Sequence, residues 1–392
     1  MEKRICTVCS CKENEVLFHQ SFSGFSDNNL LSSYDVVACD SCGFTYADHI
    51  PDQKVFDVYY RELSKYESNN LELRESPFDH NRFSIMVKYL KPFLNNANVH
   101  IAEVGCATGF LLSLFKKEGF TNLTGIDPSP ACTSAAKKHY GINVLTNTIS
   151  NIELADNSVD VLILVGVLEH IRDLDYSLEK LWKKLKPNGN FFIAIPDGSQ
   201  YFNGQDAPFQ EFSVEHINFF GPGSLENLMK KNKFSKIDIT QEIIEVNHKT
   251  LTPVILSVFK KEEKANTAFI PDPDSKKNLK TYIEMCKNKE KDINHIIKSV
   301  SKENGEIIVW GTGAQTLRLL VNSSLKDAKI SAFVDSNPKY QGKLLNGVPV
   351  IAPEILKTRS EPILISTRAY QSEIETQIKD VLGLKNKVIK LY

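Results

Sequence analysis

The stretch that most constrains the fold is residues 99–127, which read VHIAEVGCATGFLLSLFKKEGFTNLTGID. The pattern predicts an apolar strand, a turn at Gly105, an amphipathic helix and a second strand ending in Asp127. This order is half of a nucleotide-binding α/β unit, so we expect an α/β fold. Gly105 lets backbone approach a ligand closely because it has no Cβ atom. Asp127 can accept hydrogen bonds from both hydroxyls of a ribose. A strand–helix–strand without a ligand is the alternative.

The turn itself reads Gly-Cys-Ala-Thr-Gly from Gly105 to Gly109 and lacks the G-x-G-x-x-G spacing typical of dinucleotide sites. Glu103 stands two residues before the first glycine. A carboxylate there would repel pyrophosphate, which a dinucleotide site must hold at the helix N-terminus. It suits instead a cationic ligand that carries an ammonium and a sulfonium.

The run E-V-G-C-A-T-G-F-L-L resembles the first motif of class I S-adenosylmethionine-dependent methyltransferases, usually written [D/E]-x-G-x-G-x-G. Ala107 stands where the middle glycine is normally found, and we expect little cost from so small a residue. The resemblance implies that Glu103 anchors the methionine ammonium, that the turn passes under the methionine part and that Asp127 holds the ribose. The cofactor-binding residues expected from it are Glu103, Gly105, Cys106, Ala107, Gly109, Asp127, Pro128, Val165 and Gly166.

The following segments fit the same family. Residues 142–145 predict a short strand, and the apolar run before Glu169 predicts a buried parallel strand. Glu169 and His170 then lie at the carboxyl end of that strand, where open α/β sheets bind their ligands. For His170 we favour a role in shaping the turn over catalysis. A helix over residues 176–185 and the strand FFIAIPD complete the pattern.

The chain has 392 residues, enough for two or three domains, and a formal net charge of −1. This balance gives no electrostatic reason to expect a nucleic-acid partner. No apolar run is long enough for a membrane span, and the start MEKRICTVC has no apolar signal core, so we expect a cytoplasmic protein. We expect a zinc-binding domain over 1–75, a methyltransferase domain over 76–260 and a C-terminal Rossmann-like domain over 261–392.

Four cysteines form two C-x-x-C knuckles, Cys6 with Cys9 and Cys39 with Cys42. Two such pairs can complete a closed tetrahedral Zn²⁺ site, whose role is structural because no position remains for water. Cys11 is a fifth thiol that can compete for the metal. A redox dithiol is less consistent with doubled knuckles, and unpaired buried thiols are the remaining alternative.

A long polar and aromatic segment, residues 198–218, follows the FFIAIPD strand and ends in Glu215 and His216. Long loops after strands are often functional. We expect Ser224 to cap a helix over 225–231. Tyr59, Tyr60 and Tyr66, nearer the N-terminus, either stack on a ligand or pack against the central domain.

The knuckles, the methyltransferase core, the element E-H-I-N-F-F-G-P-G-S-L and a C-terminal α/β domain together resemble bacterial methyltransferases that act on carbon atoms of nucleotide-linked keto-sugars. In that family the element usually reads Y-H-E-H-F. The resemblance implies that His216 is the base and that Glu215 assists it. Ser213 and Val214 depart from the family tyrosine and first histidine, so methylation of carbon or of oxygen both stay open. Methylation of another small metabolite is the alternative.

The C-terminal region predicts a second Rossmann-like half. A strand over 307–310 leads into Gly311-Thr312-Gly313, and the next strand ends in Asp335. This turn can carry the nucleotide of a sugar donor, can bind NAD in a dehydrogenase, or can be structural only. A zinc-stabilised binding module without catalysis is a further alternative for the chain. The sequence does not indicate an oligomeric state.

Overall fold

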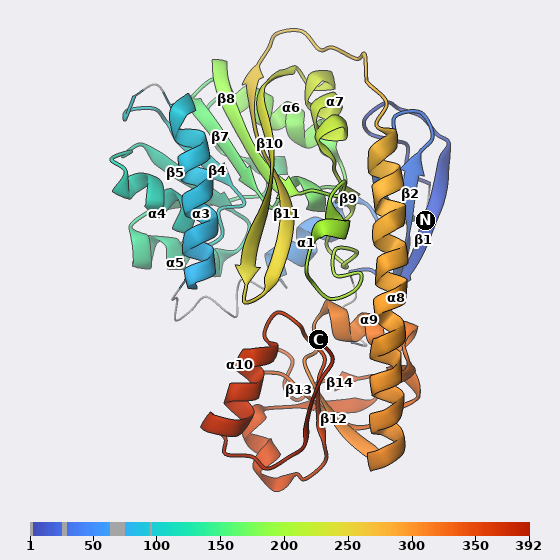
Figure 1. Ribbon diagram of the computed structural model, residues 1–392. Helices are drawn as coiled ribbons and strands as arrows, with labels where there is room; N and C mark the ends of the chain where they lie inside the picture. The colour runs from blue at the N-terminus through green and yellow to red at the C-terminus, as the bar shows by residue number, and fades with distance from the viewer. Residues whose placement is uncertain (1–2, 26–29, 63–74, 95) are drawn as a thin grey trace. The chain divides into compact units, whose positions relative to one another are not determined.

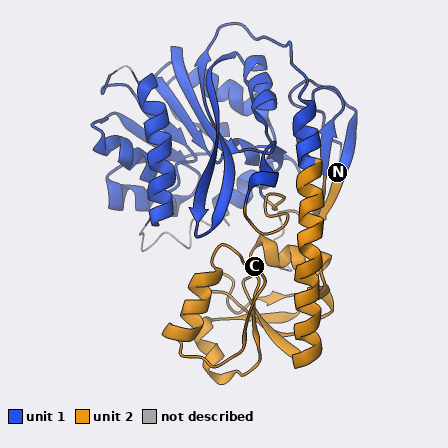
Figure 2. Ribbon diagram, in the orientation of Figure 1, with its two compact units in different colours: residues 1–17, 36–204, 215–279 blue, residues 18–35, 205–214, 280–392 orange. Residues whose placement is uncertain are grey.

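The computed structural model describes residues 3–25, 30–62, 75–94 and 96–392. Within them the chain forms two compact units (Figure 2). Unit 1 comprises residues 1–17, 36–204 and 215–279, and unit 2 comprises residues 18–35, 205–214 and 280–392. Each unit is described below by itself. The three-domain division expected from the sequence remains a prediction.

Unit 1 is built on a sheet with the strand order β10-β11-β8-β7-β4-β5-β6 (Figure 1). The strands from β8 to β6 are parallel, while β11 runs antiparallel to both β8 and β10. The carboxyl ends of β4, β5 and β7 therefore meet at one edge of the sheet. The bounds are β4 Ile101–Val104, β5 Leu123–Asp127, β6 Asn143–Thr146, β7 Val159–Val165, β8 Leu185–Pro196, β10 Phe234–Asn247 and β11 Thr250–Lys261.

Helices cover both faces of this sheet because its strands are apolar on both sides. In β7, Leu162 and Leu164 belong to one core, and Val161 and Ile163 belong to the other. Successive side chains of a strand point to opposite faces, so a continuous apolar run serves two cores. The first core includes α6 Leu174–Lys184 and α7 Pro222–Lys231; the second includes α3 Pro77–Leu90, α4 Phe110–Lys117 and α5 Pro130–Tyr140.

A smaller sheet has the order β1-β2-β3-β9. In unit 1, β3 pairs antiparallel with β9, so that Tyr46 faces Asn218 across the ladder. This pairing joins the segment after the second cysteine knuckle to the residues after His216. The bounds are β1 Asn14–Ser21, β2 Ser33–Cys39, β3 Thr45–Asp48 and β9 Asn218–Phe219, followed in sequence after β3 by the helix α1 Gln53–Glu62.

Unit 2 contains a sheet of order β14-β15-β13-β12-β16-β17, parallel except for the β14–β15 hairpin. This agrees with the second Rossmann-like half expected from the sequence. Its strands are β12 Glu306–Trp310, β13 Lys329–Val334, β14 Leu344–Leu345, β15 Val348–Ile351, β16 Ile363–Ile365 and β17 Val388–Lys390; its helices are α9 Ala314–Asn322, α10 Gln371–Thr376 and the larger part of α8 Pro273–Asn304.

Short helical turns complete the two units. The one that matters for the site is η3 Leu168–His170, directly after β7. The others are η1 Lys91–Phe93, η2 Ile149–Asn151, η4 Tyr201–Asn203, η5 Ser324–Asp327, η6 Pro353–Thr358 and the π-helical turn η7 Gln377–Val381.

The expected cap of α7 is wrong. The helix begins at Pro222, with Gly221 as its N-cap, so Ser224 is the third helical residue. The Ser224 hydroxyl reaches back and accepts a hydrogen bond from the Gly221 amide at 2.9 Å. Proline is favoured at the first helical position because its missing N–H would have no partner there. The pair Gly221-Pro222 is therefore the sequence signal for the start of this helix.

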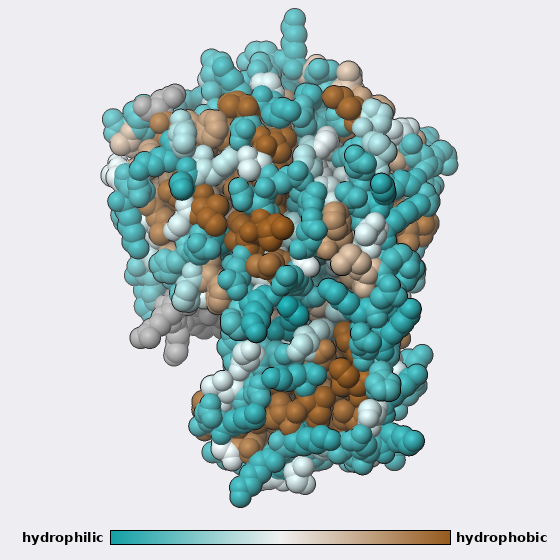
Figure 3. Space-filling view, viewed as in Figure 1, coloured by the Kyte–Doolittle hydropathy of each residue, from teal (hydrophilic) through white to brown (hydrophobic). Residues whose placement is uncertain are grey.

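The surface carries hydrophilic side chains over most of the visible face, with hydrophobic ones in separate patches (Figure 3). Across the described ranges, no helix has the length and apolar character needed to cross a membrane. Even α8, with 32 residues, is rich in lysine and glutamate.

Candidate functional site

The glycine turn between β4 and α4 folds back under the end of β5. The amides of Gly105 and Cys106 both donate to the Ile126 carbonyl, at 2.8 and 3.1 Å. Gly105, Ala107 and Gly109 have φ values of +75°, +45° and +74°. This is the left-handed region, where a side chain costs energy. The position of the usual middle glycine is therefore held by an alanine in a conformation that favours glycine.

Gly105 is also sterically required. A Cβ atom there would lie 2.6 Å from Cγ2 of Val167, which follows Val165 and Gly166 at the end of β7. Gly166 itself has a φ of +65°. Val167, which comes directly after Gly166, therefore packs against the turn, and the assignment of Val165 and Gly166 to a cofactor site stays a prediction.

Asp127 closes β5 and is fixed by two backbone donors. Its Oδ2 accepts from the Ala107 amide at 2.8 Å, and its Oδ1 accepts from the Ser129 amide at 2.9 Å. Pro128 lies between these two anchors. The carboxylate is therefore held rigidly at the edge of the sheet, beside the turn.

Glu103 is 3% exposed, and its Oε2 has no hydrogen-bond partner among the residues that the structure describes. Burial, followed by the nearby charge of Asp127, raises the pKa of Glu103 well above its ordinary value. A buried carboxylate without a cation is costly. This orphaned oxygen fits a ligand that brings a positive charge, such as the ammonium of S-adenosylmethionine.

Cys106 is buried below the same turn and is not a reactive thiol. Burial, and then the charge of Glu103, raise its pKa well above the ordinary value. Its sulfur fills the space over Gly125, where a Cβ atom would lie 2.6 Å away. We therefore see Cys106 as packing under the cofactor turn.

A second group of side chains lies where η3 meets the segment before β9. The rings of His170 and His216 are edge to face, with centroids 5.0 Å apart. His170 Nδ1 donates to the Glu215 carbonyl at 2.9 Å, since a carbonyl only accepts. His170 Nε2 is 3.8 Å from Oε1 of Glu169. We call Glu169, His170, Glu215 and His216 the histidine cluster.

Glu169, His170 and His216 offer ligand atoms that all lie within 4.8 Å of one another. Their composition suits either a proton relay or a cation. The sequence favours a role for His170 in shaping the turn, and the structure adds its contacts with Glu169 and His216. Its contact with His216 joins residues 46 positions apart, which no local pattern indicates.

Tyrosines of α1 join this group. The Tyr59 hydroxyl donates to Oε1 of Glu215 at 2.8 Å, and the Tyr60 ring lies edge to face with that of His170. Glu215 is 9% exposed. A phenol therefore lies in the histidine cluster, although Ser213 replaces the tyrosine that the family element carries. Tyr66 lies outside the described residues.

The four knuckle cysteines converge on one point. Sulfur–sulfur distances are 3.5 Å for Cys6–Cys42 and 3.4 Å for Cys9–Cys39, and all four sulfurs lie within 4.8 Å of one another. A Zn–S distance of about 2.3 Å corresponds to tetrahedral edges of roughly 3.8 Å. This donor set fits zinc. The Cys11 sulfur donates to the Glu13 carbonyl at 3.6 Å and is not one of the four.

The pKa values of the four thiols indicate that a cation would stabilise the cluster. Hydrogen bonds from Cys42 and Cys6 lower the pKa of Cys39, while the bond to Cys39 raises the pKa of Cys6 to about 12. Without a cation the cluster thus favours a single thiolate shared among neighbours. The two knuckles also match in backbone: Ser10 and Gly43, each directly after a knuckle, have φ values of +63° and +80°. Gly43 thus adopts the left-handed conformation that favours glycine.

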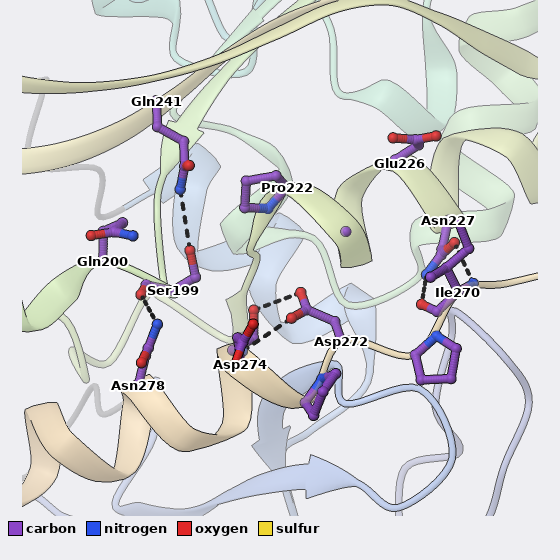
Figure 4. A pocket seen from close by; sticks show the side chains of 14 residues that line it. Ser199, Gln200, Pro222, Glu226, Asn227, Gln241, Ile270, Asp272, Asp274 and Asn278 are labelled. Atoms are coloured by element: carbon purple, nitrogen blue, oxygen red, sulfur yellow. Dashed lines mark hydrogen bonds between the residues drawn. The ribbon is translucent and has the colours of Figure 1, made fainter.

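A separate cavity of about 450 Å³ lies between the end of β8 and the starts of α7 and α8 (Figure 4). Its polar groups largely bind one another: Gln241 donates to Ser199, and Asn278 donates to the Ser199 carbonyl. Asn227 likewise bonds the backbone of Ile270 in both directions. The site residues expected from the sequence do not line it.

The second glycine turn, in unit 2, follows the same plan. Oδ2 of Asp335 accepts from both the amide and the hydroxyl of Thr312, at 3.0 and 2.5 Å. Gly311 has a φ of +113°. Asp335 therefore fixes its own turn through both the amide and the hydroxyl of Thr312.

Comparison with known proteins supports part of this account. Residues 78–239 match the family model described as "Methyltransferase domain", and residues 303–389 match one described as "C2185-like, N-terminal". The chain is similar to a ubiquinone biosynthesis O-methyltransferase of Rickettsia typhi, with 30% identity over 148 residues, covering 34% of this chain and 59% of the relative. A probable S-adenosylmethionine-dependent methyltransferase of Mycolicibacterium smegmatis is 24% identical over 119 residues, covering 30% and 46%.

The chain thus covers about half the length of these relatives. Among solved structures, a Burkholderia thailandensis 1,6-didemethyltoxoflavin-N1-methyltransferase bound to S-adenosylhomocysteine is 14% identical, covers 62% of this chain and 100% of its own, and has a TM-score of 0.42.

The expected α/β class with a class I methyltransferase core is confirmed. The matched domain and the related methyltransferases support an enzyme that uses S-adenosylmethionine. The site residues, the zinc and the nucleotide-linked sugar stay predictions.

Proposed function

We propose that the chain transfers a methyl group from S-adenosylmethionine to a nucleotide-linked sugar, with His216 as general base. The observation that carries the cofactor part is the buried Oε2 of Glu103, which has no partner among the described residues and lies below the glycine turn. Glu103 would hold the ammonium, the turn from Gly105 to Gly109 would pass under the methionine part, and Asp127 would hold the ribose. The bound cofactor would supply an already activated methyl group.

The protein's part of the chemistry is to prepare a nucleophile and hold it in line at near-attack distance. For methylation of carbon, the base takes a proton next to a carbonyl; for methylation of oxygen, it takes a hydroxyl proton. A histidine can serve either reaction because it exchanges protons near neutral pH. His216 would take the proton, and Glu215 would orient the acceptor or the ring.

The sugar as acceptor rests on the element that contains Glu215 and His216, which resembles that of the keto-sugar enzymes. The Tyr59 hydroxyl on Glu215 supports this assignment, because it puts a phenol into a cluster that lacks the family tyrosine at Ser213.

Methylation of a phenolic or other small metabolite is the second candidate. The relatives named as ubiquinone biosynthesis O-methyltransferases favour it. The same base and the same cofactor site would serve, so only the acceptor distinguishes the two. An NAD-dependent reaction at Gly311 is less consistent with the chain, because it leaves the buried carboxylate of Glu103, beside the other glycine turn, without a role.

We further propose that Cys6, Cys9, Cys39 and Cys42 hold a structural zinc ion. Since such thiols stay reduced in the cytoplasm, we expect the protein to act there on a small-molecule substrate, without nucleic acid or membrane as partner.

The test is methyl transfer from labelled S-adenosylmethionine to a panel of nucleotide-linked keto-sugars and of phenols. We expect His216→Ala to bind S-adenosylhomocysteine normally and to lose turnover about 100-fold or more, as general bases contribute. His248→Ala, at an exposed hairpin position, is the matched control. Undiminished turnover of His216→Ala would remove the base from the mechanism, and transfer to phenols alone would replace the sugar.

A further inference from the structure

Arg4 is a buried arginine that touches the segment after His216. It is 2% exposed and stands two residues before Cys6. Its Nη1 donates to the carbonyls of Ala47 and Ile217, at 2.8 and 3.1 Å. Its Nη2 donates to Oδ1 of Asn218 at 3.0 Å and to the Arg172 carbonyl at 3.5 Å. One guanidinium thus joins the knuckle segment, η3 and β9.

Asn218 continues the connection to the other histidine. This residue is 1% exposed, and its Nδ2 donates to the carbonyls of Leu168 and Ile171, at 2.9 and 2.7 Å. Those two carbonyls flank Glu169 and His170. The Ile217 amide also donates to the Glu169 carbonyl at 2.8 Å. The backbone on both sides of His170 and directly after His216 is therefore fixed by the same pair of side chains.

Burying the charged guanidinium of Arg4 costs free energy that an apolar side chain in the same place would not cost. An arginine side chain carries its charge at neutral pH, and burial disfavours that charge. Within the described part of the chain, its guanidinium binds carbonyl and amide oxygens and no carboxylate. Replacing buried charge by apolar side chains is often neutral or stabilising. What an apolar residue cannot do is donate to four acceptors on three segments at once.

We propose that Arg4 and Asn218 are positioning residues that hold the imidazoles of His170 and His216 in their edge-to-face arrangement. The proposal rests on the proposed function only in taking His216 as the reacting group. It makes the N-terminal cysteine segment part of the catalytic apparatus, because that segment delivers Arg4. Asp48 anchors it there by accepting from the Arg4 amide at 2.6 Å.

A purely structural role predicts something different. Loss of stability alone would lower the melting temperature and leave the imidazoles unchanged in the fraction that remains folded. A positioning role predicts altered imidazoles in folded protein. The readout must therefore report on the rings directly, below the melting temperature.

The experiment is ¹³Cε1-histidine NMR on the full chain saturated with S-adenosylhomocysteine, recorded across a pH series. Arg4→Lys keeps the positive charge but loses the planar set of N–H donors of the guanidinium, and Arg4→Met loses both the charge and the donors. Arg318→Lys is the matched control, since Arg318 is equally buried but lies in unit 2, where it pairs with Glu290. The signals of His139 and His248, which are exposed, serve as internal references.

We expect the His170 and His216 signals to move and their titration midpoints to change by about half a pH unit or more in both Arg4 variants. Affinity for S-adenosylhomocysteine should stay within about twofold, because Arg4 touches none of the residues around Glu103 and Asp127. Arg318→Lys should leave both histidine signals in place. Unchanged signals in folded Arg4 variants would overturn the proposal.

Asn218→Asp decides the question if the Arg4 variants do not fold. Aspartate keeps an acceptor for Arg4 but removes the donors to Leu168 and Ile171. A shift of the His170 signal supports the proposal, and an unmoved signal overturns it. Failure of the proposed function would appear in a different experiment, as full turnover of His216→Ala. The NMR result on the Arg4 and Asn218 variants therefore tests the positioning role separately.

Discussion

At the scale of single residues, the electrostatics of the proposed cofactor site centre on Glu103. A buried carboxylate with an orphaned oxygen, close to the fixed carboxylate of Asp127, is unfavourable until a cation arrives. The same feature that makes the protein without ligand less stable thus provides the driving force for binding a cationic ligand.

Glu103→Gln should raise the melting temperature and weaken S-adenosylhomocysteine binding about 10- to 100-fold, the worth of a hydrogen bond to a charged group. Because the folded-state pKa of Glu103 is raised, the folded protein keeps this proton above the ordinary pKa, where the unfolded chain has lost it. Its contribution to stability is therefore complete below the ordinary pKa and falls as the pH rises toward the raised value.

Ligand binding should accordingly tighten as the pH rises toward the raised pKa of Glu103, and it should release protons below that pKa. Calorimetry in two buffers of different ionisation enthalpy measures this release. Equal proton release in wild type and Glu103→Gln would contradict the assignment.

The two small residues of the turn make a matched pair. Gly105→Ala should cost at least about 2 kcal/mol, because it adds a left-handed alanine and a contact with Val167 at 2.6 Å. Ala107→Gly should stabilise the protein by up to about 1 kcal/mol, because Ala107 has a φ of +45°. Chemical denaturation measures both. A more stable Gly105→Ala protein would refute the account of the turn.

Residues near one another in sequence were largely predictable at this scale. The chemistry of Glu103 and Gly105 follows from a strand–turn–helix pattern that local propensities specify. The partners of His170 could not be predicted, because its contact with His216 depends on how η3 packs against the segment before β9.

At the scale of elements, most strands and helices follow from period and length. The apolar run at β7 predicts a strand buried on both faces, and the structure has it at Val159–Val165. Boundaries were harder. α8 begins at Pro273, directly after Asp272. The Asp272 amide there bonds the Cys42 carbonyl at 2.9 Å, a tertiary contact that no local signal indicates.

The cysteine knuckles give a prediction for their elements. Cys39→Ser should reduce the zinc content from about one per chain to near zero, and Cys11→Ser should leave it unchanged, because a closed site takes four ligands. Elemental analysis of protein purified without chelator measures both. Zinc retained in Cys39→Ser but lost in Cys11→Ser would exchange the roles of the two cysteines.

At the scale of the whole molecule, the chain contains two Rossmann-like units with one plan. In each, an aspartate at the end of the second strand accepts a hydrogen bond from the amide of the glycine turn, Ala107 in unit 1 and Thr312 in unit 2. The sequence indicated both turns. It did not distinguish them, because the hydroxyl of Thr312 that binds Asp335 is apparent only when the side chains are placed.

We expect S-adenosylhomocysteine to slow hydrogen exchange at residues 101–112 and 123–129 of unit 1 and to leave residues 306–316 of unit 2 unchanged. The reason is that, of the two glycine turns in the described residues, only the one in unit 1 has a buried carboxylate oxygen without a partner, that of Glu103. Mass spectrometry of peptides resolves these segments. Protection confined to residues 306–316 would move the cofactor site to unit 2.

The contacts that sequence reasoning missed are those between distant segments. Arg4 reaches the site from the N-terminal region and stands in no motif. Tyr59 was expected to stack on a ligand or to pack against the central domain, but its hydrogen bond to Glu215 was not foreseen. Their roles depend on the β3–β9 pairing, which brings together residues more than 170 positions apart. Periodicity within one segment carries no information about such a pairing.

The most direct test of the central claim is calorimetric titration of the purified protein with S-adenosylhomocysteine and, separately, with NAD⁺. The account predicts about one S-adenosylhomocysteine per chain, abolished by Asp127→Ala and unaffected by Asp335→Ala. Binding of NAD⁺ without S-adenosylhomocysteine, abolished by Asp335→Ala, would contradict it.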